Sequence, residues 1–280
     1  MVEVLKNGFY DSIQDLGRWE GISYGIPIAG AMDQHALLQA NLQLQNPANA
    51  AVLEITFKGP RLQFHQPTVI CVSGAEMEIT INDSIPVGYL TPTPLNGGDI
   101  LSFGRLEKGI RSYLAVEGGF QTQKIFGSRS WYPGITPQHR LQKGDLIPFL
   151  KCTSLKPMSC DTLQNDYLSY NTLKVYPGPE FGLLSEKSKS MLLEAFHISN
   201  QNSRMAYLME ELVPNDLPDI ITAPAQPGTV QLTPSGQIII LMRDSQTTGG
   251  YPRILQLEEA SINTLAQKKA GDEIRFEILS

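Results

Sequence analysis

The sequence predicts a mainly β protein, and three observations lead to this prediction. Short stretches rich in Val, Ile, Thr and Phe recur between turn residues, at 52–57, 69–73, 77–81 and 110–116. The 280 residues include 24 Gly and 19 Pro, so turns are frequent, and several prolines fall where an interior strand cannot continue. Long amphipathic helical patterns are few. Together these features favour barrels or sandwiches with many corners.

Three short helices are expected beside the strands. The first begins at about Asp33, which is a good N-cap residue. The second lies near residues 183–194. The third lies near residues 259–269, where apolar residues recur at helical spacing and a glycine follows.

One pattern, Gly-Asp-x-(Ile/Leu)-x-Phe, occurs three times, beginning at Gly98, Gly144 and Gly271. Glycine permits a positive φ angle, and an aspartate side chain accepts hydrogen bonds from nearby backbone amides. The alternating apolar residues that follow would face one core. The pattern therefore predicts a chain reversal that leads into a strand at all three places.

A polar stretch between Phe149 and Thr172 has no apolar periodicity and marks the expected domain boundary. It divides the chain into an N-terminal β domain of residues 1–165 and a smaller C-terminal β domain of residues 166–280. The two halves are expected to be related barrels.

The composition argues against several classes of partner. A formal charge of -6 and a pI near 5.3 give no broad cationic surface, so nucleic acid and anionic membranes are not expected as partners. The longest apolar runs, at 69–72 and 238–242, are far shorter than the roughly 20 residues of a spanning helix. The N-terminus has no basic head followed by an apolar segment, so the cytoplasm is the expected compartment.

The cysteines fit reduced thiols better than a disulfide framework, because Cys71, Cys152 and Cys160 are odd in number and widely spaced. Cys71 is expected in the core of a strand. The common phosphate-loop, zinc-protease and nucleophile-elbow motifs are absent from the sequence. The four histidines show no metal-ligand spacing, so no metal site is expected.

The first polar segment that could carry chemistry contains Asp15 and Arg18, three residues apart. Arg18 could hold a substrate carboxylate through two parallel hydrogen bonds. The alternative is a buried ion pair with Asp15 that ties the loop to the barrel.

Two further segments combine arginine with small or amide residues. In residues 127–130, Ser128 and its neighbours could expose backbone N–H groups to an anion while Arg129 supplies positive charge, although a plain tight turn explains the same residues. In residues 202–205, Asn202 and Arg204 could reach a ligand or cap neighbouring carbonyls.

The most distinctive segment is 243–253, which follows the apolar strand at 237–242. Polar groups at the end of a buried strand are costly unless they bond to one another or to a ligand. We assign catalytic roles to Asp244 as a base and to Gln246 and Thr247 as hydrogen-bonding groups. We assign substrate binding to the remaining candidates, which are Asp15, Arg18, Ser128, Arg129, Asn202, Arg204, Thr248, Gly249 and Tyr251.

At these residues the chain resembles the family formed by the C subunits of bacterial 5-oxoprolinase, whose relatives have also been called allophanate hydrolase subunit 2, Kip antagonist and biotin-dependent carboxyltransferase domain. The resemblance runs in collinear order along nearly the whole chain. Its motifs are Asp15-Leu16-Gly17-Arg18, Gly25-Ile26-Pro27, Gly30-Ala31-Met32-Asp33, Leu53-Glu54-Ile55, Ser73-Gly74-Ala75, Tyr113-Leu114-Ala115-Val116-Glu117-Gly118-Gly119, Gly127-Ser128-Arg129-Ser130, Asn202-Ser203-Arg204-Met205 and Gln246-Thr247-Thr248-Gly249-Gly250-Tyr251-Pro252.

The resemblance implies two cyclophilin-like β-barrel domains with a few short helices. It implies a B subunit of related fold and an A subunit as partners, which together open the lactam of 5-oxo-L-proline to L-glutamate using ATP. ATP is expected to serve the complex rather than to bind clearly to this chain. Arg243 precedes Asp244 where the family commonly has a small residue, so substrate preference stays open.

Three functions therefore follow as hypotheses. The first is an enzyme subunit that is inactive alone and opens a small cyclic amide with its partners. The second is half of a carboxyltransferase acting on urea or a related amide, with its biotin on another protein, because this chain has no Met-Lys biotinyl site. The third is a regulatory antagonist that binds a kinase-inhibitor-like B subunit.

Overall fold

The computed structural model describes residues 1–150 and 166–279, which form two compact units. The first unit is Met1–Arg18 with Ala29–Leu168, and the second is Trp19–Ile28 with Ser169–Ser280. A short segment near the N-terminus thus belongs to the second unit. Residue 165, where we expect the domain boundary, lies outside the described residues together with Cys152 and Cys160, and this boundary stays a prediction.

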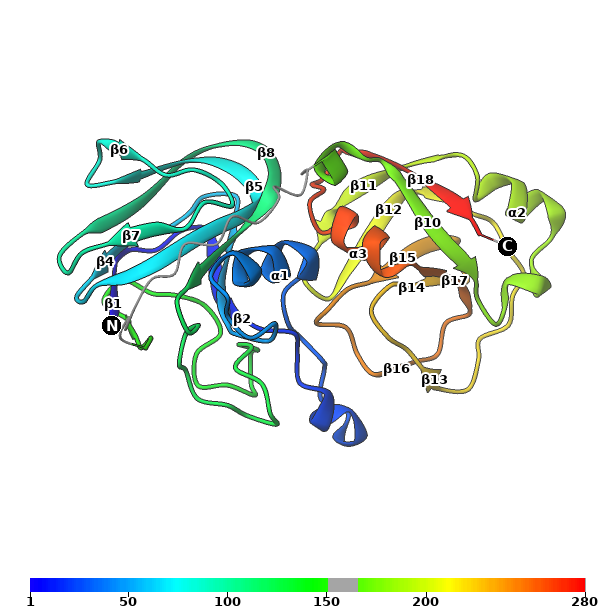
Figure 1. Ribbon diagram of the computed structural model, residues 1–280. Helices are drawn as coiled ribbons and strands as arrows, with labels where there is room; N and C mark the ends of the chain where they lie inside the picture. Colours follow the sequence, from blue (N-terminus) through cyan, green and yellow to red (C-terminus); the bar gives the residue numbers. More distant parts are fainter. Residues whose placement is uncertain (151–165, 280) are drawn as a thin grey trace. The chain divides into compact units, whose positions relative to one another are not determined.

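The described part of the first unit contains a nine-stranded sheet and one α-helix (Figure 1). Strands follow the order β2-β3-β8-β4-β1-β9, and β5 pairs with β6, β7 and β8. The elements are β1 (Val2–Lys6), β2 (Tyr10–Gln14), α1 (Gln34–Gln43), β3 (Val52–Thr56), β4 (Arg61–Phe64), β5 (Thr68–Ile81), β6 (Ile85–Pro86), β7 (Thr93–Leu95), β8 (Ile100–Val116) and β9 (Leu146–Ile147).

Helix α1 packs against β5 and β8 and begins at Asp33, as predicted. The Asp33 carboxylate accepts a hydrogen bond from the Ala36 amide at 3.0 Å, which satisfies one of the free amides of the first turn. Beneath the helix, the buried Glu54 Oε2 accepts from the Met32 amide at 2.7 Å and from the Tyr113 hydroxyl at 2.9 Å. These bonds fix the chain where it enters α1.

The second unit is a closed seven-stranded barrel in the order β10-β17-β14-β15-β12-β11-β18 (Figure 1). Its pairs are antiparallel except for β10 and β18, which are parallel. The elements are η1 (Trp19–Tyr24), β10 (Thr172–Pro177), η3 (Phe181–Leu183), α2 (Glu186–Met191), β11 (Ala195–Asn202), β12 (Ala206–Leu212), β13 (Ala223–Pro224), β14 (Thr229–Leu232), β15 (Gln237–Leu241), β16 (Thr248–Gly249), β17 (Arg253–Leu257), α3 (Glu259–Leu265) and β18 (Glu273–Ile278). The turn η2 (Asp166–Ser169) spans the point where the chain passes between the units.

Strand β14 is buried on both faces, and one of these faces carries polar side chains. Val230 and Leu232 are fully buried on one face, and alternation places Thr229 and Gln231 on the other. Thr229 and Gln231 are also buried, because further chain covers them. The short ribbon of β13 and β16 contributes to this cover, since a Cβ on Gly249 would lie only 2.6 Å from Nε2 of Gln231.

The three Gly-Asp turns are confirmed. Each glycine has a positive φ, between 82° and 100°, and each turn leads into β8, β9 or β18. In each turn the aspartate accepts a hydrogen bond from the amide three residues earlier, at 2.7 Å for Asp99, 2.8 Å for Asp145 and 2.9 Å for Asp272. The repeated sequence is therefore a repeated turn.

The prediction of a mainly β chain with a few short helices is confirmed. The expected second helix is realised as η3 and α2, and the third as α3. Cys71 is buried in β5, as expected, and burial raises the pKa of its thiol to about 12. Among the described residues, no helix has the length and apolar character needed to cross a membrane.

Candidate functional site

The sequence-predicted site residues fall into two groups, one in each unit. Asp15, Arg18, Ser128 and Arg129 belong to the first unit. The second unit holds Asn202, Arg204, Asp244, Gln246, Thr247, Thr248, Gly249 and Tyr251.

Asp15 is the centre of a closed hydrogen-bond network in the first unit, and it is only 6% exposed. Its Oδ1 accepts from the hydroxyls of Ser128 at 2.6 Å and Ser130 at 2.7 Å, and from the Gly17 amide at 2.8 Å. Its Oδ2 accepts from the Arg129 amide at 2.7 Å. We call these five residues the Asp15 network; it ties the 127–130 turn to the end of β2.

The two arginines of this region also bond within the unit. Arg18 is completely buried, and its Nη2 donates to the carbonyl of Ser130. Arg129 donates through Nη1 to the carbonyl of Thr122 and through Nη2 to Oε1 of Gln121 at 2.7 Å. These contacts hold the turn in place, and substrate binding by Asp15, Arg18, Ser128 and Arg129 stays a prediction.

In the second unit, the 243–251 loop is anchored at its base by a buried ion pair between Arg204 and Asp244. Nε of Arg204 donates to Oδ2 of Asp244 at 2.8 Å, and Nη2 donates to Oδ1 at 3.0 Å. The two side chains are 9% and 7% exposed. Both carboxylate oxygens of Asp244 are thus engaged by Arg204, so this carboxylate would have to leave the pair to act as a base.

Arg243, one residue earlier, anchors the same loop on another side. Its guanidinium pairs with Glu259 in the first turn of α3, and Nη2 also donates to Oδ1 of Asn263 at 3.3 Å. Arg243 is only 5% exposed. Two consecutive residues therefore fix the loop to α3 and to the turn before β12.

Beyond this base, the loop carries groups that are more open. Gln246 and Thr247 are partly buried, whereas Thr248 and Tyr251 are exposed. Thr248 and Gly249 form β16, and the carbonyl of Thr247 accepts from the Ala225 amide at 2.9 Å. Asn202 ends β11, where its side chain donates to the carbonyl of Ser199 at 2.8 Å.

The open end of this loop borders a pocket of 460 Å³, which we call the larger pocket. Its polar groups include Thr229, Thr247 and Arg253. Its other lining residues are Trp19, Ile22, Ile28, Pro177, Gly178, Pro179, Pro224, Ala225, Gln226, Leu255 and Gln256. Apolar walls with a few placed polar groups are typical of a small-molecule site. Of the predicted site residues, Thr247 lines it.

Arg253 of the larger pocket is held by Glu180. Its Nη2 donates to Oε1 at 2.9 Å and its Nε to Oε2 at 3.2 Å. Burial alone would raise the pKa of Glu180, but the hydrogen bonds from Arg253 outweigh burial and leave this pKa below its ordinary value. The pair therefore stays charged and fixes one wall of the pocket.

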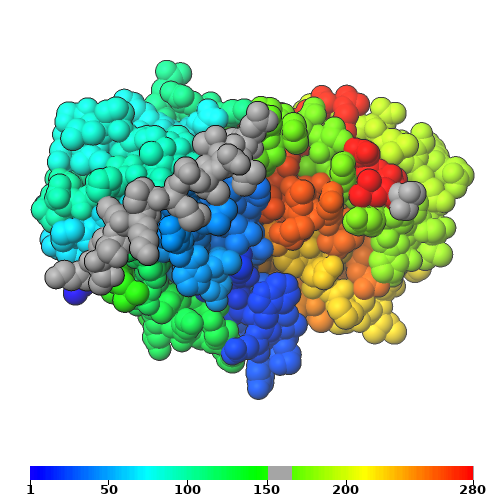
Figure 2. Space-filling model, viewed as in Figure 1, coloured from blue at the N-terminus to red at the C-terminus, as the bar shows by residue number. Residues whose placement is uncertain are grey.

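A second cavity of 290 Å³, the smaller pocket, shares Trp19, Ile28, Gln226 and Gln256 with the larger one. Arg243 and Glu258 also line it. Figure 2 shows η1 at the surface in dark blue, and Trp19 within it is 63% exposed. Sequence reasoning missed this residue, because its neighbours in the second unit are far away along the chain.

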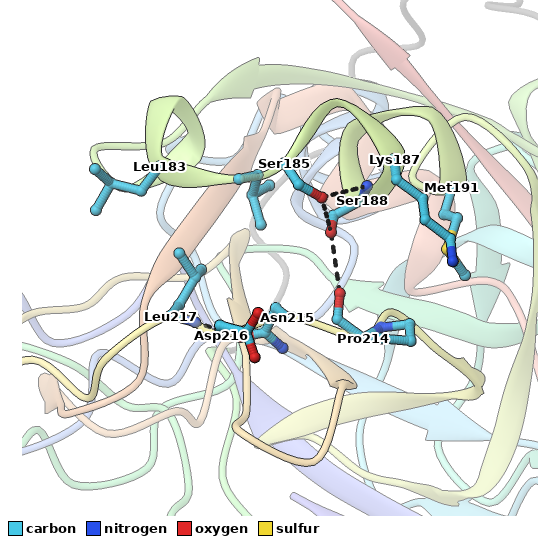
Figure 3. Close-up of a pocket in the computed structure, with 10 residues that line it drawn as sticks. Leu183, Ser185, Lys187, Ser188, Met191, Pro214, Asn215, Asp216 and Leu217 are labelled. Atoms are coloured by element: carbon cyan, nitrogen blue, oxygen red, sulfur yellow. Dashed lines mark hydrogen bonds between the residues drawn. The ribbon is translucent and has the colours of Figure 1, made fainter.

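A third pocket, of 360 Å³, lies between α2 and the segment after β12 (Figure 3). Several of its polar groups bond to one another. The hydroxyl of Ser188 donates to the carbonyl of Pro214 at 3.0 Å and lies 2.8 Å from the hydroxyl of Ser185. None of the predicted site residues lines this pocket, so we do not assign the function to it.

No group of three His, Cys, Asp or Glu side chains within residues 1–150 and 166–279 is arranged to hold a metal ion.

Comparison with known families matches residues 24–278 to the family described as carboxyltransferase domain, subdomain A and B. The chain is 33% identical to the 5-oxoprolinase C subunit of Escherichia coli (strain K12), over 99% of this chain and 90% of that protein.

Two solved structures are similar in fold. The crystal structure of TTHA0988 has a TM-score of 0.89 and 25% identity, over 99% of this chain and 55% of that one. The Kluyveromyces lactis urea carboxylase has a TM-score of 0.85 and 27% identity, over 100% of this chain and 27% of that one. This chain therefore spans about half the length of the first structure and about a quarter of the second.

Proposed function

Because this chain belongs to the family of carboxyltransferase domains with subdomains A and B, we propose that it is the C subunit of an ATP-dependent 5-oxoprolinase. With A and B subunits it would open 5-oxo-L-proline to L-glutamate. The observation that carries this proposal is the 33% identity to a 5-oxoprolinase C subunit over nearly the full length of both chains. In the comparison with the urea carboxylase, in contrast, this chain covers only about a quarter of the length of the other protein.

The chemistry of lactam opening agrees with the larger pocket as the substrate site. A lactam is a poor electrophile, so its carbonyl oxygen must be activated, and donors must stabilise the negative charge that develops there. Thr247 offers a hydroxyl, and Gln226 offers a side-chain amide, among apolar walls. We assign these two groups to contact the amide of the substrate.

The proposal places ATP on a partner subunit. The chain has no Gly-x-x-x-x-Gly-Lys-(Ser/Thr) loop, and Arg253 of the larger pocket is already paired with Glu180. These residues do not fit a nucleotide on their own, so no step through ATP is assigned to them.

A second candidate function is half of a carboxyltransferase acting on urea, and the similarity to the K. lactis urea carboxylase favours it. This reaction needs a biotinylated carrier. The chain has no Met-Lys site, so the carrier would be another protein.

Reconstitution tests the proposal. The full chain is purified alone, with the B subunit, and with the A and B subunits, and each preparation is assayed for L-glutamate formed from 5-oxo-L-proline and ATP. We expect turnover only in the three-subunit preparation. Carboxylation of urea from a biotinylated carrier, without glutamate formation, would replace the proposal with the second candidate. A stable complex with the B subunit that converts neither substrate would favour a regulatory antagonist.

A further inference from the structure

Two exposed phenylalanines of the first unit contact each other. Phe9 is 66% exposed and Phe57 is 37% exposed. Their ring centroids lie 5.7 Å apart and the ring planes stand at 89° to each other, an edge-to-face arrangement that aromatic pairs favour. Aromatic side chains are enriched in the centres of protein interfaces. The function proposed above makes no use of this pair.

The backbone at Phe57 has a conformation that bulky residues avoid. Its φ angle is 59°, and the Lys58 amide donates to the Thr56 carbonyl at 2.7 Å, which closes a tight three-residue turn around Phe57. Glycine would adopt this φ without strain, yet the position holds phenylalanine. Backbone strain of this kind is concentrated at functional sites. The turn therefore points to a role for the exposed ring.

The strained turn is fixed to the turn that carries Phe9. The Phe9 amide donates to the Lys58 carbonyl at 2.8 Å, and the Phe57 amide donates to the Ile110 carbonyl of β8 at 2.9 Å. A Cβ at Gly8 would lie only 2.1 Å from the Lys58 carbonyl oxygen, so the two turns are in close contact. Both rings are thus positioned before a partner binds, which lowers the entropic cost of binding.

Three exposed cations border the aromatic pair. Lys58 lies in the strained turn, and Lys6 lies at the end of β1. Arg140 precedes Leu141, whose amide donates to the carbonyl of Asp11 in β2 at 2.7 Å. None of the three cationic side chains has an ion-pair partner within residues 1–150 and 166–279. In a chain with a formal charge of -6, this local positive border favours an acidic partner.

We call Phe9, Phe57, Lys6, Lys58 and Arg140 the Phe9 surface. We propose that it docks a segment of a partner protein in which an aspartate or glutamate flanks an apolar side chain. The apolar side chain packs against the two rings, and the carboxylate pairs with the cations. An anionic membrane matches this surface less well, because the chain as a whole is negative. The choice of partner to test rests on the proposed function, which supplies the A and B subunits.

Calorimetric titration of the full chain with the purified A subunit and with the purified B subunit tests the docking, at low and at high salt. We expect one subunit to bind, and to bind more weakly at high salt. Phe9→Ala should weaken binding at least about tenfold, and Lys58→Glu should weaken it more at low salt than at high salt. The matched controls, Tyr170→Ala and Lys187→Glu at exposed positions of the second unit, should bind as the unmodified chain does.

Phe57→Gly separates docking from a structural role of the ring. Because glycine adopts the positive φ freely, the melting temperature should stay within about 3 °C of the unmodified chain while affinity falls at least about tenfold. Phe57→Tyr keeps the ring and should retain binding. A lower melting temperature in Phe57→Gly with unchanged affinity would show that the ring serves packing only. Should Phe57→Gly fail to fold, the largely exposed Phe9 decides through Phe9→Ala.

The outcomes separate this inference from the proposed function. Equal affinity of all variants for the subunit that binds would overturn the inference, even if the complex opens 5-oxo-L-proline. The expected pattern of affinities without turnover would support the inference and refute only the proposed function.

Binding of neither subunit would refute the proposed function, and two peptide probes then decide the inference. They are Asp-Phe-Glu-Leu-Asp and its basic counterpart Lys-Phe-Lys-Leu-Lys. Saturable binding of the acidic peptide alone, lost in Phe9→Ala, would support the inference, whereas no binding or equal binding of both would overturn it. Self-association of the chain, or binding to phosphatidylserine vesicles, that Phe9→Ala abolishes would also overturn it, because the surface would then serve a second copy or a membrane.

Discussion

The Asp15 network of the first unit and the 243–251 loop of the second contain the same kinds of residue but use them differently. Asp15 takes four donors from its own unit, and the nearby arginines donate to carbonyls and an amide oxygen. The 243–251 loop is held at its base by the Arg204–Asp244 pair and at β16 by pairing with β13, and Thr247 borders a pocket. A cluster of polar residues in a sequence therefore indicates either a turn held by internal hydrogen bonds or a binding site. The number of groups left for a ligand tells the two apart.

The largest expected effect comes from removing the carboxylate at the centre of the Asp15 network. Asp15→Ala would leave two buried and two partly buried donors without their acceptor, at a cost of about 5 kcal/mol in the free energy of unfolding of the first unit. Urea unfolding, followed by Trp131 fluorescence in a Trp19→Phe background, measures this loss. Glu107→Ala, at an exposed position of β8, is the control and should change stability by less than about 0.5 kcal/mol. A loss below about 1 kcal/mol for Asp15→Ala would show that the network does not hold the turn.

Asp11, also in the first unit, contrasts with Asp15, because hydrogen bonds satisfy its buried carboxylate only in part. Asp11 is 2% exposed; its Oδ2 accepts from the Gly8 amide at 2.7 Å, and its Oδ1 has no hydrogen-bond partner among the described residues. Burial raises the pKa of Asp11 to about 7, against the lowering effect of backbone hydrogen bonds. The folded state therefore binds this proton more tightly than the unfolded state does.

The sign of the pH dependence follows from that difference. The contribution of Asp11 to the free energy of unfolding is greatest below the unfolded pKa near 3.8 and falls as the pH rises to about 7, by an amount on the order of 4 kcal/mol. Asp11→Asn should remove most of this fall, which is measured as the difference in unfolding free energy between pH 4 and pH 8. An equal pH dependence in Asp11→Asn and in the unmodified chain would assign the effect to other groups.

The base of the 243–251 loop should respond to substitution as the Asp15 network does, with a loss of stability. Arg204→Met leaves the buried carboxylate of Asp244 without the arginine that engages both its oxygens, and should cost about 3 kcal/mol in the second unit. Calorimetric unfolding measures the loss. The double variant Arg204→Met with Asp244→Leu should recover most of it, because neither charge is then left alone. A double variant as unstable as the sum of the single ones would mean that the pair does not act as a unit.

The smallest expected effect lies at β16. A Cβ at Gly249 would meet the terminal nitrogen of Gln231, which is the end of a flexible side chain. Gly249→Ala should therefore cost less than about 1 kcal/mol. In a Gln231→Ala background, Gly249→Ala should cost nothing further, and the same calorimetric measurement decides it. A larger loss that Gln231→Ala does not relieve would point to backbone strain instead.

Local features of the fold were predictable from the sequence. Asp33 caps α1 through the next turn of chain, and the three Gly-Asp turns depend on residues within three positions. The site was less predictable, because its parts are brought together by the barrel. Trp19 reaches the second unit from the N-terminal part of the chain, and Arg253 lies opposite Gln231 through strand pairing. Neither relation leaves a periodic or local signal in the sequence.

The sequence identified the individual polar segments, but it did not show which of them bond within their own unit and which border a pocket. Asp15 and Thr247 both lie in segments rich in polar residues and glycine, and only the structure shows that the carboxylate of Asp15 is filled by hydrogen bonds from its own unit. Arg243 drew attention only as a departure from the family pattern. Only the structure shows that Arg243 is buried and pairs with Glu259 and Asn263 of α3.

The most direct test of this account is turnover of the reconstituted complex with Thr247→Val. The substitution removes a hydroxyl at the larger pocket and keeps the shape of the side chain. We predict that kcat/KM falls about tenfold to a hundredfold at an unchanged melting temperature, while Ser128→Ala, which removes one donor of the Asp15 network, lowers the melting temperature. Full turnover in Thr247→Val, together with lost turnover in Ser128→Ala at an unchanged melting temperature, would place the ligand on the first unit and contradict the account.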